Sequence, residues 1–135
     1  MPPGDQPASI LDASALIAFL HDEPGADAVV EALAATAAIS VVNWAEALSK
    51  IAADGDDPQQ VAASLQTDDA PLRIEPLNDA DCVTIARLRP LTKAQGLSLA
   101  DRACLALAQR LDLPVLTADR EWKNLELGIR VQLIR

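Results

Sequence analysis

The chain has 135 residues, 50% of them hydrophobic and only 2% aromatic, which is typical of one domain with an aliphatic core. Its formal net charge of −9 argues against a protein that binds nucleic acid through a generally basic surface. Met1–Pro7 contain no Lys or Arg, and no apolar run reaches the roughly 20 residues that cross a bilayer. We therefore expect a cytoplasmic protein with no membrane partner.

Residues 1–8 are rich in proline and are expected to form a flexible N-terminal tail, which leaves residues 9–135 as the single domain. The two cysteines, Cys82 and Cys104, lie far apart in apolar, helix-like segments. We interpret them as buried free thiols rather than as a disulfide, which is typical of a reducing compartment.

Hydrophobic patterns predict that strands alternate with helices along the chain. In chain order, we expect a strand at 9–11, helices at 14–21 and 26–35, a strand at 38–40, helices at 42–54 and 58–66, a strand at 72–76, a helix at 78–89, a loop at 90–96, a helix at 98–111, and strands at 114–117 and 129–134. This alternation indicates an α/β fold in which a parallel sheet is covered by helices on both faces.

Two aspartates come at or just after the ends of predicted strands. Asp12 follows the first strand, and Asp119 follows the strand at 114–117. Because ligands of such folds bind at the carboxyl ends of the strands, these positions predict a site there. A structural role is the alternative, since each aspartate can also cap the helix or turn that follows it.

Glu46 and Asp101 have small, apolar neighbours. Glu46 lies between two alanines, and Asp101 follows the segment LSLA. A carboxylate in such surroundings is more costly to desolvate than one on a charged face, which favours a function. The alternatives are a helical ion pair between Glu46 and Lys50 and a capping box between Ser98 and Asp101.

Four segments carry these acids in order: 11–16 (LDASAL), 43–47 (NWAEA), 97–108 (LSLADRACLALA) and 116–122 (LTADREW). Together they resemble the PIN-domain ribonucleases, in particular the VapC toxins of type II toxin–antitoxin systems, and the resemblance spans residues 10–134. It implies a PIN-like α/β domain with about five parallel strands, hydrolysis of RNA phosphodiester bonds with Mg²⁺ or Mn²⁺, a homodimer, and inhibition by a cognate antitoxin protein.

The expected active site consists of Asp12, Glu46, Asp101 and Asp119. Oxygen ligands select a hard divalent cation, and the absence of His and Cys from the cluster argues against zinc. We expect the three aspartates to face the metal, directly or through water, and Glu46 to hold a metal-bound water and help to deprotonate it.

Four further positions are expected to support the acids or the substrate. The hydroxyls of Ser14 and Thr117 lie beside the acids in sequence and can bond a carboxylate or water, although Ser14 is equally suited to capping a helix. Arg102 and Arg120 each follow an acid and can neutralise the cluster, touch phosphate or form surface ion pairs. Other cations near the predicted loop at 90–96 are Arg87, Arg89 and Lys93.

Three alternative functions are consistent with parts of this pattern. One is a non-catalytic module of the same fold that binds RNA or protein, and another is a nuclease that acts on DNA, because carboxylates and metal do not distinguish the sugars. A phosphoacceptor receiver domain also has clustered acids on a parallel sheet, but the middle strand here ends in IEPL at 74–77, with no aspartate at its tip.

Overall fold

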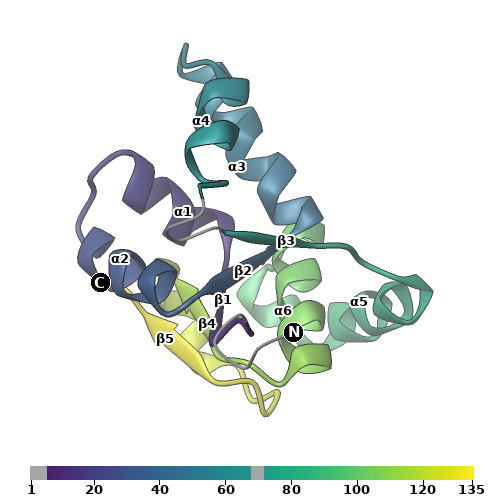
Figure 1. Cartoon of the computed structure of the whole chain (residues 1–135). Coiled ribbons are helices and arrows are strands. Elements are labelled where there is room, and N and C mark those ends of the chain that lie inside the picture. The colour runs from purple at the N-terminus through teal and green to yellow at the C-terminus, as the bar shows by residue number, and fades with distance from the viewer. Residues whose placement is uncertain (1–5, 68–71) are drawn as a thin grey trace.

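The computed structural model describes residues 6–67 and 72–135 (Figure 1). Most of the tail predicted at residues 1–8 therefore lies outside the described residues. The strands are β1 (Ser9–Leu11), β2 (Ala37–Ser40), β3 (Arg73–Glu75), β4 (Val115–Thr117) and β5 (Val131–Leu133). The helices are α1 (Ala13–Leu20), α2 (Ala26–Ala34), α3 (Val41–Ala53), α4 (Pro58–Ser64), α5 (Asp79–Leu91) and α6 (Leu99–Leu111), with short 3₁₀ turns η2 (Lys93–Gln95) and η3 (Arg120–Asn124).

The five strands form one sheet in the order β3-β2-β1-β4-β5, and every neighbouring pair is parallel. The predicted α/β fold with a five-stranded parallel sheet is confirmed. The chain leaves the central strand β1 in one direction toward β2 and returns on its other side to β4. The carboxyl ends of β1 and β4 therefore flank the point where strand order reverses, which is where such sheets bind ligands.

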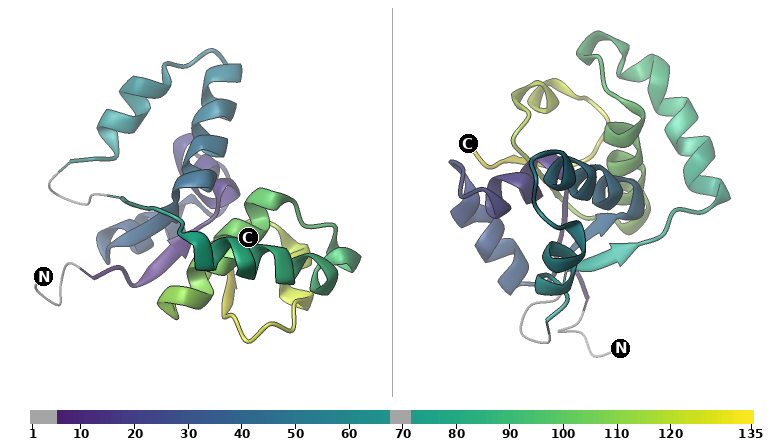
Figure 2. Two further views of the ribbon diagram at one scale, coloured as in Figure 1. Left: turned by 90° about the vertical axis from the view of Figure 1, so that its right-hand side faces the viewer. Right: turned by 90° about the horizontal axis from the view of Figure 1, so that it is seen from above.

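Side chains alternate between the two faces of the sheet, as strand geometry requires. Leu11, Ile39 and Leu116 pack with helices α1 to α4 on one face. Their neighbours Ile10 and Val115 pack with α5 and α6 on the other, together with the buried Trp122 and Cys104. Figure 2 shows the two groups of helices on opposite sides of the strands. Both faces are thus covered, which explains why the three inner strands β1, β2 and β4 are buried along their whole length, whereas the edge strands β3 and β5 carry polar residues and are only partly buried.

The segment after Arg89 differs from the prediction. Helix α5 continues through Pro90 to Leu91, and η2 follows, where we expected a loop at 90–96. Pro90 lacks the backbone N–H that would donate to the Ala86 carbonyl, so one bond of the last turn is missing. The helix end is still closed, because the backbone N–H and the hydroxyl of Thr92 both donate to the Leu88 carbonyl, at 3.0 and 2.8 Å. A proline this close to a helix end does not break the helix.

Helices α3 and α4 form a hairpin that projects from the rest of the molecule (Figures 1 and 2). Helix α3 is anchored at its base by the buried residues Asn43, Ala47 and Ile51, whereas α4 contributes no fully buried residue. The cysteines are both free, but only Cys104 is buried, and the prediction of a buried Cys82 is wrong because its side chain faces outward on α5. No helix among the described residues has the length and apolarity to cross a membrane.

Candidate active site

A cavity of about 260 Å³ is lined by all four predicted acids, Asp12, Glu46, Asp101 and Asp119. Each acid comes from a different element. Asp12 and Asp119 follow β1 and β4, Glu46 lies in the middle of α3, and Asp101 lies in the first turn of α6. Ends of two adjacent parallel strands and two helices therefore bring together residues that are far apart in the sequence. We call this space the acidic cavity.

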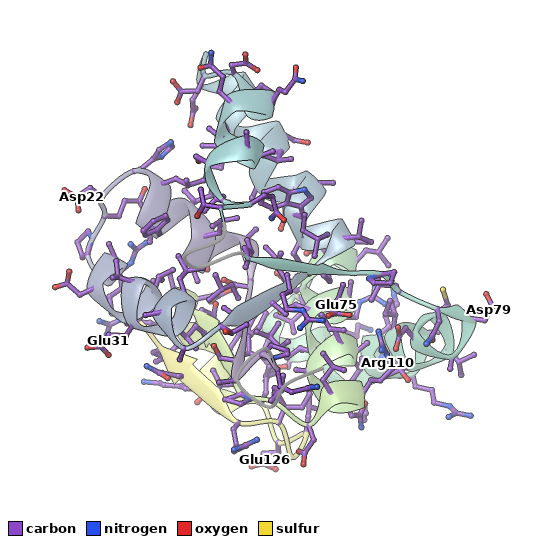
Figure 3. The ribbon with its side chains drawn as sticks, viewed as in Figure 1. Asp22, Glu31, Glu75, Asp79, Arg110 and Glu126 are labelled. Carbon is purple, nitrogen blue, oxygen red and sulfur yellow. The ribbon has the colours of Figure 1, made fainter. Side chains whose placement is uncertain are left out.

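Another cavity, of about 430 Å³, lies between α5 and α6 and is lined by a single acid, Asp81. Arg110 neutralises this carboxylate with bonds of 3.0 and 3.1 Å from its Nε to the two oxygens, and its Nη2 donates to the Pro76 carbonyl. Figure 3 shows Arg110 of α6 close to α5. That acid is committed to a structural ion pair, in contrast to the four acids of the acidic cavity.

Asp12 is the most buried of the four acids, with 4% of its surface exposed. Its Oδ1 accepts hydrogen bonds from the Ser14 hydroxyl at 2.7 Å and the Ala15 amide at 2.8 Å, and its Oδ2 accepts one from the Thr117 hydroxyl. Burial raises the pKa of Asp12 from 3.8 to about 6, the three hydrogen bonds oppose that rise, and the charge of Asp101 adds to it. The cavity thus favours a cation or a proton at Asp12.

Two hydroxyls join the first helix to the loop after β4. The Ser14 hydroxyl accepts the Ala118 amide at 2.9 Å, and the Thr117 hydroxyl accepts the Asp119 amide at 3.0 Å. Ser14 itself lines the acidic cavity, whereas Thr117 is fully buried behind Asp12. The same hydroxyls that orient Asp12 therefore also fix the backbone from which Asp119 projects.

Asp101 and Asp119 are held by helix-terminal hydrogen bonds. Asp101 and Ser98 form a capping box, in which the Ser98 amide donates to Asp101 Oδ2 at 3.0 Å and the Asp101 amide donates to Ser98 Oγ at 3.1 Å. Asp119 caps η3 by accepting the Glu121 amide at 3.0 Å. These capping bonds restrict the carboxylates, while each acid still reaches the acidic cavity.

Asn43 is a site residue to which the sequence pattern alone assigned no role. It is 1% exposed, its Nδ2 donates to the Ala100 carbonyl at 2.9 Å, and its Oδ1 accepts from the Ser40 hydroxyl. The bond to the Ala100 carbonyl links α3, which carries Glu46, to the residue that precedes Asp101 on α6. A hydrogen-bonding amide three residues before an acid, on the same helix face, is the signal that could have indicated it.

Glu46 has a raised pKa, first because of desolvation and then because of the charge of Asp101. A hydrogen bond with Asn43 and the positive charge of Lys50 oppose this rise. Lys50 also lines the acidic cavity, so its predicted pairing with Glu46 does not remove it from the site. It places one ammonium group beside four carboxylates.

Arg102 lies outside the acidic cavity, although it follows Asp101 directly. Consecutive helical residues point about 100° apart, so Arg102 turns toward α5, where its Nη1 donates to the Ile85 carbonyl at 2.9 Å. Of the roles that the sequence left open for Arg102, neutralisation of the four acids does not fit this position, because Arg102 does not line their cavity. Arg120 is exposed.

The donor set of the acidic cavity fits a hard divalent cation. All four acids offer oxygen, the ligand of Mg²⁺ and Mn²⁺, and no His or Cys lines the cavity. Within residues 6–67 and 72–135, no three acids, histidines or cysteines converge closely enough to enclose an ion by themselves. The fit is therefore to an ion that keeps several waters and bonds directly to one or two carboxylates, as Mg²⁺ commonly does.

Residues 9–127 match the PIN domain family. The chain is a member of that family. The fold of this PIN domain is similar to a toxin–antitoxin complex chain from Klebsiella pneumoniae, with 22% identity, a TM-score of 0.74, and coverage of 94% of this chain and 98% of that one. It is also similar to VapBC2 from Rickettsia felis bound to a promoter DNA fragment, with 18% identity, a TM-score of 0.69, and coverage of 93% and 97%.

A third similar structure is VapC20 from Mycobacterium tuberculosis, a toxin that cleaves the sarcin–ricin loop, with 12% identity and a TM-score of 0.69 over 90% of this chain and 98% of that one. A comparison with curated protein sequences gave no match. The membership predicted from the four acidic segments is confirmed, and these structural likenesses extend the agreement to nearly the whole fold.

Proposed function

We propose that this PIN domain is a metal-dependent endoribonuclease and the toxin of a toxin–antitoxin pair. The observation that carries the proposal is the convergence of Asp12, Glu46, Asp101 and Asp119 on one cavity at the carboxyl ends of β1 and β4. Four carboxylates in one partly desolvated space repel one another, so they require compensating charge. A divalent cation in the same place would also neutralise the charge that develops on a phosphate during hydrolysis.

Asp12, Asp101 and Asp119 would hold Mg²⁺ or Mn²⁺, directly or through water. The bound ion would supply an acidified water and charge neutralisation at the phosphate. Glu46 would orient that water and serve as the base for its proton, a role for which its raised pKa makes it better suited than an ordinary glutamate. Ser14 and Thr117 keep the Asp12 carboxylate in a fixed orientation. Lys50, at the cavity wall, is placed to attract the phosphate.

The proposed partners follow from the similar structures. The Klebsiella and Rickettsia chains belong to toxin–antitoxin assemblies, and VapC20 is a toxin that cleaves an RNA loop. By analogy, we propose that a cognate antitoxin inhibits this chain in the cytoplasm, that the chain forms a homodimer, and that its substrate is an RNA. Recognition of an RNA loop by shape suits a protein of charge −9, which cannot rely on many phosphate contacts.

The test is cleavage of structured and single-stranded RNA with Mg²⁺, Mn²⁺ or EDTA. We expect cleavage only with metal, and a loss of at least about a hundredfold for Asp12→Asn or Asp101→Asn, because each amide keeps the size of the side chain but lacks the charge that holds the ion. Glu31→Gln on α2 is the matched control, since Glu31 is exposed at the outer edge of the molecule (Figure 3) and does not line the cavity.

Three results would each redirect the proposal. Cleavage of DNA in preference to RNA would make the protein a DNA-directed nuclease. Metal binding with no cleavage of either would favour a non-catalytic module of the same fold. Cleavage by folded Asp12→Asn at the rate of the unmodified protein would contradict the assignment of the site.

A further inference from the structure

We propose that a second cavity, on the far side of the Ser98–Asp101 capping box, binds a neighbouring phosphate of the RNA strand whose scissile phosphate enters the acidic cavity. The inference rests on the proposed ribonuclease function. This basic cavity measures about 620 Å³ and lies between the end of α5 and the start of α6, with Arg89, Lys93 and Arg102 among its lining residues.

Arg102 is a buried cation whose hydrogen bonds are incomplete. It is 6% exposed, and its Nη1 donates to the Ile85 carbonyl. Its Nε is buried without a hydrogen-bond partner, and no ion pair found among residues 6–67 and 72–135 includes it. A buried charge without a counter-ion is costly, and an anion in the cavity would relieve that cost.

The charge of the lining selects an anion. Arg89 and Lys93 are exposed at the rim, Arg102 lies deeper, and no acidic residue lines this cavity. A guanidinium offers paired donors that match two phosphate oxygens, and the start of the 13-residue helix α6 adds the positive end of its dipole. The lining is therefore the electrostatic opposite of the acidic cavity.

A single capping box separates the two cavities. Ser98 lines the basic cavity and Asp101 lines the acidic one, and the two residues exchange hydrogen bonds of 3.0 and 3.1 Å. A strand that places one phosphate at Asp101 thus passes the basic cavity within about one turn of α6. A protein with a negative net charge thus has a local group of cations that can bind phosphate next to its proposed active site.

The first experiment compares Arg89→Ala and Lys93→Ala with Arg87→Ala in cleavage of a short single-stranded RNA with Mg²⁺. Arg87 is the matched control, because it is exposed on the same helix but lines the separate cavity between α5 and α6. We expect the KM to rise about fivefold to tenfold for Arg89→Ala and Lys93→Ala, with kcat within about twofold, and Arg87→Ala to leave both unchanged.

The second experiment measures the affinity for RNA at several salt concentrations in EDTA. Every protein compared carries Asp12→Asn, which prevents cleavage. Removing Lys93 should reduce the slope of log affinity against log salt by about 0.7, the value for one phosphate contact on a single strand, whereas removing Arg87 should not. Equal KM values and equal slopes for Lys93→Ala, Arg89→Ala and Arg87→Ala would overturn the proposal, even if the protein proves to be a ribonuclease.

A third measurement stands apart from RNA cleavage. Titration with inorganic phosphate should shift the backbone amide resonances of residues 96–102 in the unmodified protein, and the Arg102→Lys variant, which keeps the charge but lacks the paired donors, should bind at least about threefold more weakly. Shifts without any RNA cleavage would uphold the anion site while the ribonuclease function fails. An absence of shifts would overturn the site itself.

Discussion

Asp12 accepts three hydrogen bonds, which stabilise its charge, yet burial raises its pKa to about 6. Desolvation therefore outweighs well-placed donors, and the neighbouring charge of Asp101 increases the imbalance. The donors orient the carboxylate without satisfying its charge. A divalent cation would do so, which makes Asp12 the residue at which metal binding and folding stability are most directly coupled.

This coupling predicts how stability changes with pH. The folded protein holds the Asp12 proton more tightly than the unfolded chain, whose pKa is near 3.8, so Asp12 favours folding in acid and this contribution is lost as the pH rises through about 6. Without metal, the raised pKa of Asp12 lowers the free energy of unfolding by about 3 kcal/mol above pH 7, compared with its value in acid. The Asn side chain does not ionise. As the pH rises from about 4.5 to about 7, the free energy of unfolding of Asp12→Asn, measured in urea, should therefore increase by about 2 kcal/mol relative to that of the unmodified protein.

The comparison needs EDTA throughout, because bound metal would remove the difference by stabilising the unmodified protein. Glu31→Gln again serves as the control and should show a difference from the unmodified protein that does not change with pH. A pH-independent difference for Asp12→Asn as well would mean that the Asp12 carboxylate is not desolvated in solution.

At the level of helices and strands, the sequence predicted most of the fold because apolar runs and caps are local signals. The five strands, the caps at Asn78 and Ser98, and the proline in the first turn of α4 follow from patterns within a few residues. The end of α5 was not predictable in this way, because a proline usually indicates a break, whereas Pro90 lies one residue before the helix end and costs only one backbone hydrogen bond there.

In the candidate site, too, residues with a local sequence signal were predictable and residues that depend on distant partners were less so. The four acids were predictable from their places after strands or in apolar helices, and the caps formed by Asp12, Asp101 and Asp119 coexist with their positions in the cavity. The role of Asn43 was harder to predict, because an amide near an acid is only a weak local signal and its partner, the Ala100 carbonyl, is 57 residues away in sequence. Only the packing of α3 against α6 brings the two together.

Two capping boxes allow the structural and functional roles of a cap to be separated. Ser98→Ala removes the hydroxyl that accepts the Asp101 amide, and Asn78→Ala removes the equivalent acceptor of the Asp81 amide on α5. Each should lower the free energy of unfolding by about 1 kcal/mol. Only Ser98→Ala should also lower kcat for RNA cleavage, by about tenfold, because it loosens Asp101, an acid of the proposed active site.

A rescue variant completes this comparison. Ser98→Thr restores a hydroxyl and should recover most of both losses. If Asn78→Ala reduced kcat as much as Ser98→Ala does at equal loss of stability, the effect would be a general consequence of weakened helices and not of a displaced Asp101.

Across the whole molecule, negative charge has two distinct settings. Exposed acids such as Asp22, Glu31, Asp79 and Glu126 lie at the periphery, where water screens them (Figure 3). The acidic cavity instead gathers four carboxylates in a space of about 260 Å³, where Asp12 is buried, Asp101 is half-buried, and Glu46 and Asp119 remain exposed. A chain of net charge −9 attracts cations in general, and the acidic cavity is the place where we propose that one binds and stabilises the fold.

Mn²⁺ or Mg²⁺ should therefore raise the Tm of the protein. At about a hundred times the Kd, an ion that binds only the folded state adds about 2.7 kcal/mol, which corresponds to roughly 10 °C for a domain of this size. Asp12→Asn should show less than half of this shift in differential scanning calorimetry, and Glu31→Gln the full shift. Equal shifts for all three proteins would place the metal at peripheral acids.

The projecting hairpin of α3 and α4 gives the molecule two regions of unequal local stability. Helix α4 has no fully buried residue, so its backbone amides should exchange with deuterium through sub-global opening, well before those of the sheet. The base of α3 is held by Asn43 and Ala47, both buried, and Glu46 lies between them. We therefore expect that the tip can open, be cut by a protease or be bound by another protein while Glu46, on the same helix, stays in position.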